Sequence, residues 1–156
     1  MSTLFIDPGA KNAGAAIFED KELVSAWLAR GKNWQETADD VFKYVPVPQV
    51  VETIVIERMQ IYKDTPLAHA NDCITLSLMS GRVAGMFPNC NVIEYTPAKW
   101  KGGTPKAIMT ERIIGLLSQD ELDRITVPKA KSLMHNVYDA VGLGIRHTRG
   151  TRALGW

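Results

Sequence analysis

The sequence predicts an α/β domain on a mixed five-stranded sheet with helices on both faces, and three observations lead to this expectation. Three apolar segments near the N-terminus are separated by tight polar turns, as in an antiparallel meander. Later apolar segments alternate with helical patterns, as in α/β proteins. The chain has 156 residues, 46% hydrophobic and 22% charged, which suits one globular domain.

The first three strands follow one another closely. Residues 4–6 form an apolar strand that ends at an Asp-Pro-Gly turn, and residues 13–18 form the second strand. A Glu-Asp-Lys turn leads into the third strand, residues 22–29. Strict alternation would place Leu23 and Trp27 on the same face of this strand. Because both turns are short, we expect the three strands to be antiparallel.

Helices and strands alternate in the middle of the chain. Asn33 is a suitable N-cap for a helix over residues 34–44, which two prolines then terminate. Residues 53–56 are uncharged and mostly β-branched, as expected of a strand that is buried on both faces. A helix over residues 69–86 and a strand over residues 91–95 follow.

The last third of the chain is predicted to be helical. A Thr-Pro pair begins a helix that runs to about residue 117, because proline is favoured in the first turn of a helix. Helices over residues 118–125 and 133–147 complete the domain, whose expected limits are residues 1–147. Residues 148–156 form a basic tail with two glycines, which we expect to fray.

Several classes of protein are excluded by the composition. The longest uncharged run of the second predicted helix, residues 73–81, is far shorter than the ~20 apolar residues that cross a bilayer. The N-terminus has neither the basic segment nor the cleavage site of a secretory signal. Cys73 and Cys90 lack metal-binding spacing and suggest reduced thiols. We therefore expect a protein without membrane association in the cytoplasm of a bacterial or phage-infected cell, with an organelle as the alternative.

Charge is unevenly distributed along the chain. Residues 1–95 carry 8 Lys and Arg against 12 Asp and Glu, whereas residues 96–156 carry 10 against 5. Such a distribution suits a carboxylate site beside a phosphate-binding surface. The alternative is that these surface charges simply mix in space.

Three carboxylates occupy positions where structural carboxylates are rare. Asp7 and Glu57 each follow a predicted buried strand, and Asp139 lies within a mostly apolar helix. Strand ends are where open α/β sheets place their sites. Buried carboxylates repel one another unless a cation compensates them, and hard oxygen ligands suit Mg²⁺ or Mn²⁺. Each residue also has a structural alternative, as a turn former, an ion-pair partner or part of a solvated helix face.

His135 is a fourth candidate for this site. It stands four residues before Asp139 and therefore shares its helix face. Gly142 continues that line, and its missing side chain is expected to leave space for a ligand. His135 can ligate a metal, transfer a proton or be merely structural.

Several short motifs together resemble RuvC-type Holliday-junction resolvases of the ribonuclease H-like superfamily. Residues 5–9 (FIDPG) resemble the first strand of that family, residues 55–57 (VIE) its fourth strand, and residues 135–140 (HNVYDA) its last helix. Residues 95–106 are similar to the phage-encoded and chloroplast branches. The resemblance extends over residues 4–146, nearly the whole chain.

The resemblance implies two-metal hydrolysis of a phosphodiester at a four-way DNA junction by a homodimer. Asp7, Glu57 and Asp139 would hold two Mg²⁺ ions per active site, with Mn²⁺ as a substitute. Many bacterial members carry an acidic residue or His three positions before the last Asp, where this chain has Asn136. His135, four positions before it, resembles the chloroplast branch, so ligation of a metal and proton transfer both stay open.

Basic residues near aromatic ones are expected to form the DNA surface. One group follows Glu57, where Tyr62, and after it Met59 or Ile61, is the expected wedge in a base stack; these apolar side chains can instead pack under their loop. Trp100 lies within a second basic group and can instead be a core anchor. The expected DNA contacts are Lys11, Arg58, Met59, Tyr62, Lys63, Lys99, Lys101, Lys106 and Arg112.

The favoured function is therefore a metal-dependent endonuclease that cleaves Holliday junctions or other branched DNA. The alternatives are an RNA-processing nuclease of the same superfamily and an inactive junction-binding protein. The helix over residues 69–86 is the expected dimer interface, through its small and apolar positions Ala70, Leu78, Gly81 and Gly85. The alternative is that these positions pack only within the chain.

Overall fold

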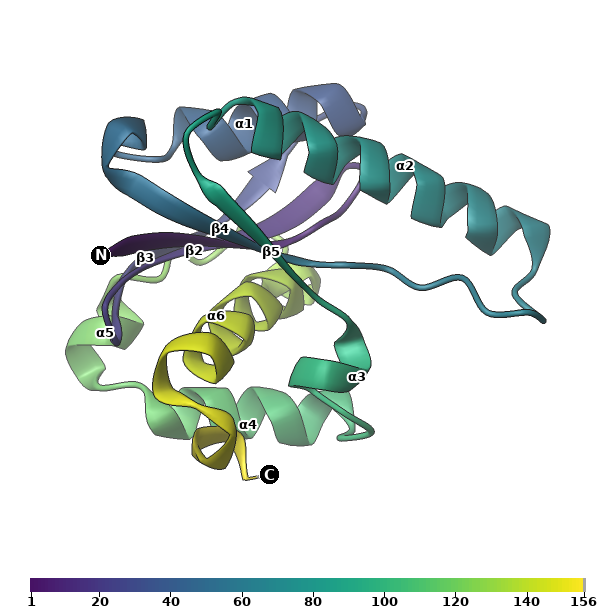
Figure 1. Cartoon of the computed structure of the whole chain (residues 1–156). Helices are drawn as coiled ribbons and strands as arrows, with labels where there is room; N and C mark the ends of the chain where they lie inside the picture. Colours follow the sequence, from purple (N-terminus) through teal and green to yellow (C-terminus); the bar gives the residue numbers. More distant parts are fainter. Residues whose placement is uncertain (156) are drawn as a thin grey trace.

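The computed structural model describes residues 1–155 and contains one five-stranded sheet (Figure 1). The order of the strands across the sheet is β3-β2-β1-β4-β5. The strands are β1 Ser2–Asp7, β2 Asn12–Glu19, β3 Glu22–Arg30, β4 Val51–Glu57 and β5 Asn91–Tyr95. β1 to β3 form the expected antiparallel meander, whereas β4 is parallel to both β1 and β5. The sheet is therefore mixed, as predicted.

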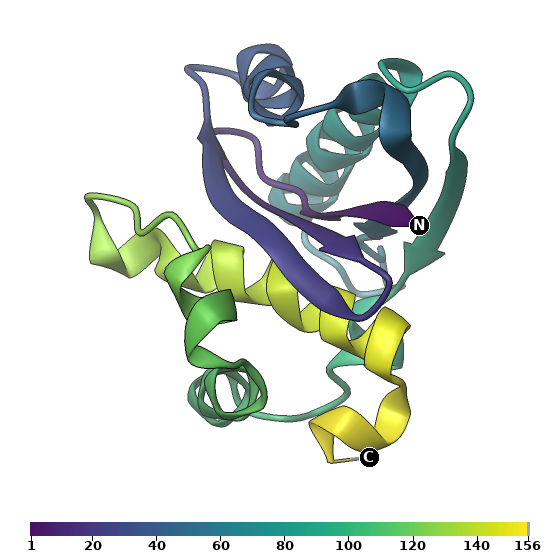
Figure 2. The same cartoon turned by 90° about the vertical axis from the view of Figure 1, so that its left-hand side faces the viewer.

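Helices cover both faces of this sheet (Figures 1 and 2). On one face lie α1 Trp34–Lys43 and α2 Leu67–Gly85; on the other lie α4 Lys106–Leu116 and α6 Met134–Arg149, with α5 Gln119–Asp123 beside β3. Asn33 caps α1 as expected, since its side chain accepts from the Glu36 amide. None of the helices in the described part combines the length and apolar character that a bilayer crossing requires.

The sheet separates two hydrophobic cores because successive side chains of its central strands point to opposite faces. In β1, Phe5 packs toward α6, while Leu4 and Ile6 pack toward α1 and α2. In β4, Val55 packs toward α6, and Ile54 packs toward α1 and α2. The central strands are thus buried on both sides, which fixes the positions of the residues that follow them.

A β-bulge changes the predicted faces of β3. Ile17 pairs with Ser25 but Phe18 pairs with Leu23, so β3 has one residue more than β2 at this point. Leu23 therefore packs into the core beneath α6, and Trp27 packs into the opposite core. The prediction that Leu23 and Trp27 share a face is wrong, because alternation does not continue through a bulge.

The C-terminal segment is folded onto the domain, so the prediction of a fraying tail is wrong. α6 continues to Arg149, and a 3₁₀ helix, η3 Thr151–Leu154, follows it. Leu154 is buried, and Arg112 Nη1 donates to its carbonyl oxygen over 3.1 Å. The sequence gives little sign of this packing, because only Ala153 and Leu154 of this short segment contact the core.

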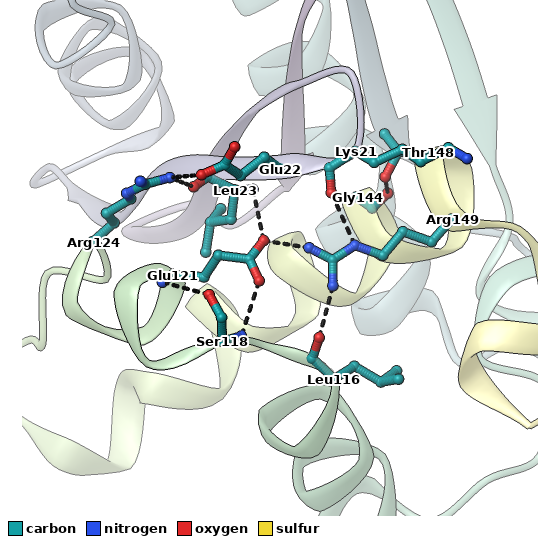
Figure 3. A network of polar contacts seen from close by, with 10 residues as sticks. All are labelled: Lys21, Glu22, Leu23, Leu116, Ser118, Glu121, Arg124, Gly144, Thr148 and Arg149. Carbon is teal, nitrogen blue, oxygen red and sulfur yellow. Dashed lines mark hydrogen bonds and ion pairs between the residues drawn. The ribbon is translucent and has the colours of Figure 1, made fainter.

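A polar network anchors the last helix (Figure 3). The Glu121 carboxylate of α5 accepts the Leu23 amide at 2.9 Å and forms an ion pair with Arg149. The same guanidinium donates to the carbonyl oxygens of Lys21, at 2.9 Å, and Leu116, at 2.7 Å. The end of α6 is thereby tied to three other parts of the chain.

Candidate active site

Two carboxylates lie side by side at the carboxyl ends of neighbouring central strands. Asp7 ends β1 and Glu57 ends β4, and these parallel neighbours are in register up to the pair Ile6 and Ile56. Glu57 is only 4% exposed. Because the strands run side by side, the residues that follow their last apolar positions emerge together, as the sequence predicted.

α6 brings the third carboxylate to the same place. The buried face of α6 consists of Val137, Ala140 and Val141. Asp139 lies beside this face, and its side chain is 14% exposed. Gly14 permits this close approach, because a Cβ at this position would lie 1.8 Å from the carbonyl oxygen of Asn136. Gly14 of β2 therefore determines how closely the start of α6 approaches the sheet.

The three carboxylates interact electrostatically. Burial raises the pKa of Asp7 well above its usual range, and the nearby charges of Glu57 and Asp139 raise it further. Lys101 and Lys106 only partly offset these effects. The raised pKa favours the protonated, neutral form of Asp7 in this site.

Lys101 lies between two of these carboxylates. Its Nζ is 3.2 Å from Glu57 Oε2 and 3.5 Å from Asp139 Oδ2, and it sits 4.8 Å from the centre of the Trp100 ring. The lysine comes directly after α3 Pro97–Trp100, a short helix that the sequence did not predict. The sequence predicted Lys101 only as a DNA contact and gave no indication of its contact with Glu57 and Asp139.

Trp100 joins the acidic site to the core. Its ring is fully buried, and its indole Nε1 donates a hydrogen bond to Glu57 Oε2. The alternative of a core anchor is therefore correct, and the hydrogen bond is an additional role. In the sequence, this role is indicated only by the position of Trp100 between two lysines of the basic segment.

Gly142 does not provide the expected space for a ligand. A Cβ at this position would lie 2.6 Å from Ile113 Cδ1 and 2.8 Å from Trp100 Cζ3. The missing side chain therefore makes room for the buried tryptophan. The prediction of space for a ligand is wrong because Gly142 faces Trp100 and Ile113, which belong to the next layer of the core.

His135 stands one turn before Asp139 on α6 and is half-buried. Its Nδ1 lies 2.7 Å from the carbonyl oxygen of Ser132. Since a carbonyl only accepts, Nδ1 carries the proton of this hydrogen bond. The neutral ring then has a free lone pair on Nε2, which can ligate a metal or accept a proton.

The carboxylate oxygens fit a hard divalent cation in their chemistry, and the ammonium of Lys101 shows that a cation is held there. Across residues 1–155, however, no three Asp, Glu, His or Cys side chains already converge as a metal-binding group. The predicted ligands Asp7, Glu57 and Asp139 thus share one end of the sheet without forming a preassembled cage.

The loop after Glu57 presents its apolar side chains to solvent. Ile61 is 56% exposed and Tyr62 65%, so the alternative that they pack beneath the loop is wrong. The Tyr62 hydroxyl donates to Gln60 Oε1 over 2.8 Å. Arg58 pairs with Glu94, 3.3 Å away, and its amide donates to the Tyr95 carbonyl, which ties the start of the loop to β5. The loop extends away from the sheet toward α2 (Figure 1).

The other predicted DNA contacts differ in their surroundings. Lys11, Lys63, Lys99 and Lys106 are exposed, while Met59 is half-buried. Arg112 is bonded to the Leu154 carbonyl and so supports the C-terminal segment. A hollow of about 190 Å³ is lined by Lys101, Thr104, Lys106 and Asp139 among others. A second hollow, of about 180 Å³, lies between Glu57, Met59 and α2.

Comparisons with known proteins agree with this architecture. No family model and no curated protein sequence matches the chain. Among solved structures, Thermus thermophilus RuvC in complex with a Holliday junction substrate is similar, with a TM-score of 0.64, 17% identity, and coverage of 94% of this chain and 92% of that one. The fowlpox virus Holliday junction resolvase is also similar, with a TM-score of 0.59, 19% identity, and coverage of 96% and 98%.

A third similar structure is the yeast mitochondrial Holliday junction resolvase, with a TM-score of 0.50, 10% identity, and coverage of 97% of this chain and 81% of that one. All three likenesses extend over nearly the whole chain, so the shared fold includes the meander, β4, β5 and α6 together. The chain therefore has the mixed α/β fold of RuvC-type Holliday junction resolvases, as its motifs predicted.

Proposed function

We propose that this protein is a metal-dependent endonuclease that cleaves Holliday junctions or other branched DNA. The observation that carries the proposal is the meeting of Asp7 and Glu57 at neighbouring strand ends with Asp139 of α6 beside them. Support also comes from the fold, because the RuvC structure and a fowlpox resolvase structure of the same fold contain Holliday junction DNA.

The carboxylates Asp7, Glu57 and Asp139 would hold two Mg²⁺ ions, which Mn²⁺ can replace. Such ions supply an activated water and stabilise the leaving oxygen in phosphodiester hydrolysis. Trp100 and the strand ends hold Glu57 in place. His135 offers its Nε2 either to an ion or to the proton of the attacking water, since its Nδ1 is already engaged.

The DNA would lie across the basic surface that surrounds the carboxylates. We propose that the phosphates are contacted by Lys11, Arg58, Lys63, Lys99, Lys101, Lys106 and Arg112. Tyr62 is the proposed wedge, because it is the aromatic residue of the loop after Glu57 and is 65% exposed. Met59 is half-buried and would support the loop from below.

A homodimer would supply two active sites for a junction with two-fold symmetry. On α2, Ile74 is 54% exposed and Leu78 51%, and a Cβ at Gly81 or Gly85 would meet open space. Val92 of the edge strand β5 continues this apolar surface beside α2. We therefore place the dimer interface on α2 and β5.

The test is cleavage of a synthetic four-way junction in Mg²⁺, run beside a linear duplex and an RNA–DNA hybrid. We expect cleavage of the junction alone, and we expect Asp7→Asn, Glu57→Gln and Asp139→Asn each to abolish it while junction binding persists. Lys32→Met, at an exposed site before α1, is the control and should cleave normally. Preferential cleavage of the hybrid would indicate an RNA-processing nuclease. Binding of the junction without any cleavage would indicate an inactive junction-binding protein.

A further inference from the structure

The acidic site already contains a positive charge supplied by the chain itself. Lys101 Nζ contacts both oxygens of Glu57, at 3.4 Å for Oε1 and 3.2 Å for Oε2, and lies 3.5 Å from Asp139 Oδ2. The ammonium is therefore positioned at the same oxygens that the proposed metal ions would use.

This contact is not an ordinary surface ion pair. The side chain of Lys101 is 27% exposed, and those of its partners Glu57 and Asp139 are 5% and 14% exposed. Exposed pairs contribute little to stability, whereas an uncompensated buried charge is costly. Loss of the ammonium without a replacement cation should therefore destabilise the metal-free protein.

The backbone holds Lys101 in place while its side chain remains able to move. The Lys101 amide donates to the Pro97 carbonyl at 2.9 Å, and Gly102 follows with a φ of 55°, a value that favours glycine. The four-carbon stem of lysine has rotatable bonds throughout. Beside the ammonium lies the hollow of about 190 Å³ that Thr104 and Lys106 also line.

A divalent ion and the ammonium cannot use these oxygens at the same time. Mg²⁺ binds carboxylate oxygens at about 2.0–2.1 Å, and two cations at such close range repel strongly. An ion bound by Glu57 and Asp139 would thus force Lys101 to leave them, and the neighbouring hollow gives its stem a place to turn.

We propose that Lys101 is the resident cation of this site: it partly compensates the charges of Glu57 and Asp139 in the metal-free protein and competes with the divalent ion for their oxygens. The inference rests on the proposed function, since it requires the carboxylates to be metal ligands. It adds a role for this chain's own residue, because metal loading would release a positive charge on the face where DNA phosphates are proposed to lie.

The experiment measures Mn²⁺ binding without DNA, by electron paramagnetic resonance, for the wild type and Lys101→Met. Methionine keeps much of the stem and removes the charge. Lys99→Met, an exposed lysine on α3, is the matched control. We expect Lys101→Met to bind Mn²⁺ about tenfold more tightly, because no internal cation has to be displaced. We also expect it to melt at a lower temperature in a chelator, and the control to show neither change.

The outcomes separate the two proposals. If the wild type binds Mn²⁺ and Lys101→Met binds it equally or less tightly, the resident-cation role is overturned and the metal site stands. If neither protein binds Mn²⁺ at millimolar concentration, the metal site and the resident cation are both overturned.

A second variant and a second measurement keep the proposal testable if Lys101→Met does not fold. Lys101→Arg retains the charge and should not gain affinity for Mn²⁺; a tenfold gain would contradict competition by charge. In wild-type protein, the side-chain nitrogen resonance of Lys101, assigned with this arginine variant, should move when Mg²⁺ is added. A resonance that stays in place while Mg²⁺ binds would also overturn the proposal.

Discussion

The indole N–H of Trp100 donates to the carboxylate of Glu57, and this hydrogen bond connects the hydrophobic core beneath α6 to the acidic end of the sheet. The two residues lie 43 positions apart in the sequence. Because the ring is fully buried and Glu57 nearly so, the bond fixes one carboxylate in a low-dielectric environment. The core thus orients a candidate ligand directly.

Trp100→Phe should therefore weaken both the fold and the site. Phenylalanine keeps an aromatic ring but cannot donate to Glu57. Trp27→Phe is the matched control, since the Trp27 ring is also buried and its Nε1 has no partner within the described residues. Urea denaturation should show a loss about 1.5–3 kcal/mol larger for Trp100→Phe than for the control. Junction cleavage should fall about 10–100-fold only for Trp100→Phe. Equal losses in the two variants would refute a special role for this bond.

The metal-free protein should lose stability as the pH rises above the unfolded pKa of Asp7. The pKa of Asp7 is raised in the folded state by burial and by the charges of Glu57 and Asp139. Its stabilising contribution is fully present below the unfolded pKa and is lost as the pH rises through the folded pKa. Urea denaturation in a chelator, between about pH 4 and pH 8, should show a loss of stability with rising pH that Asp7→Asn removes. An unchanged profile in Asp7→Asn would contradict this assignment.

Glu121 should produce the opposite dependence at low pH. Burial alone would raise the pKa of Glu121, but the amides of Leu23 and Ser118 and the charge of Arg149 outweigh it and lower the pKa. Its contribution is therefore present above the unfolded pKa and lost as the pH falls through the folded one. At neutral pH, Glu121→Gln should cost about 1–3 kcal/mol in urea denaturation. The exposed Glu22→Gln, which affects only the pair with Arg124, should change little.

His135→Ala distinguishes ligation of a metal from proton transfer. We expect cleavage to be lost at low Mn²⁺ and restored at high Mn²⁺, because His135 shares the helix face of Asp139 and has a free Nε2. The measurement is a cleavage titration in Mn²⁺ and Mg²⁺. A rate that stays about 10²–10⁴-fold low at saturating metal would instead indicate proton transfer. Unchanged kinetics at every concentration would mean that the residue is structural.

The wild-type protein should be a dimer of about twice 17.3 kDa by light scattering at micromolar concentration. Leu78→Glu should make it monomeric, since it places a charge on the exposed apolar face of α2. Val127→Glu, at an exposed apolar residue outside α2 and β5, is the control and should remain dimeric. A wild-type monomer, both free and bound to a junction, would exclude this assembly.

Much of the site is contained in local sequence patterns. Short apolar runs mark β1 and β4, so Asp7 and Glu57 can be assigned to strand ends from the sequence alone. The helical spacing of four sets His135 and Asp139 on one face. These inferences hold because strand and helix periodicity are properties of neighbouring residues.

Other features depend on contacts between distant parts of the chain. The bulge in β3, the folding of residues 151–154 onto α6 and the filling of the space at Gly142 each reversed a local prediction. Sequence periodicity does not report such events, since each is set by the shape and register of a neighbouring element. Only the tertiary structure therefore decided which side chains fill the core between the sheet and the helices α3, α4 and α6.

The arrangement around Glu57 shows this division most clearly. The sequence by itself determined that a carboxylate ends β4 and that lysines surround a tryptophan some forty residues later. Only the tertiary structure decided that Trp100 and Lys101 converge on that carboxylate. The physical reason is that β5 pairs in parallel with β4, so that α3, which follows β5, lies beside the end of β4. A buried Glu57 carboxylate at this position requires a hydrogen-bond donor and a positive charge.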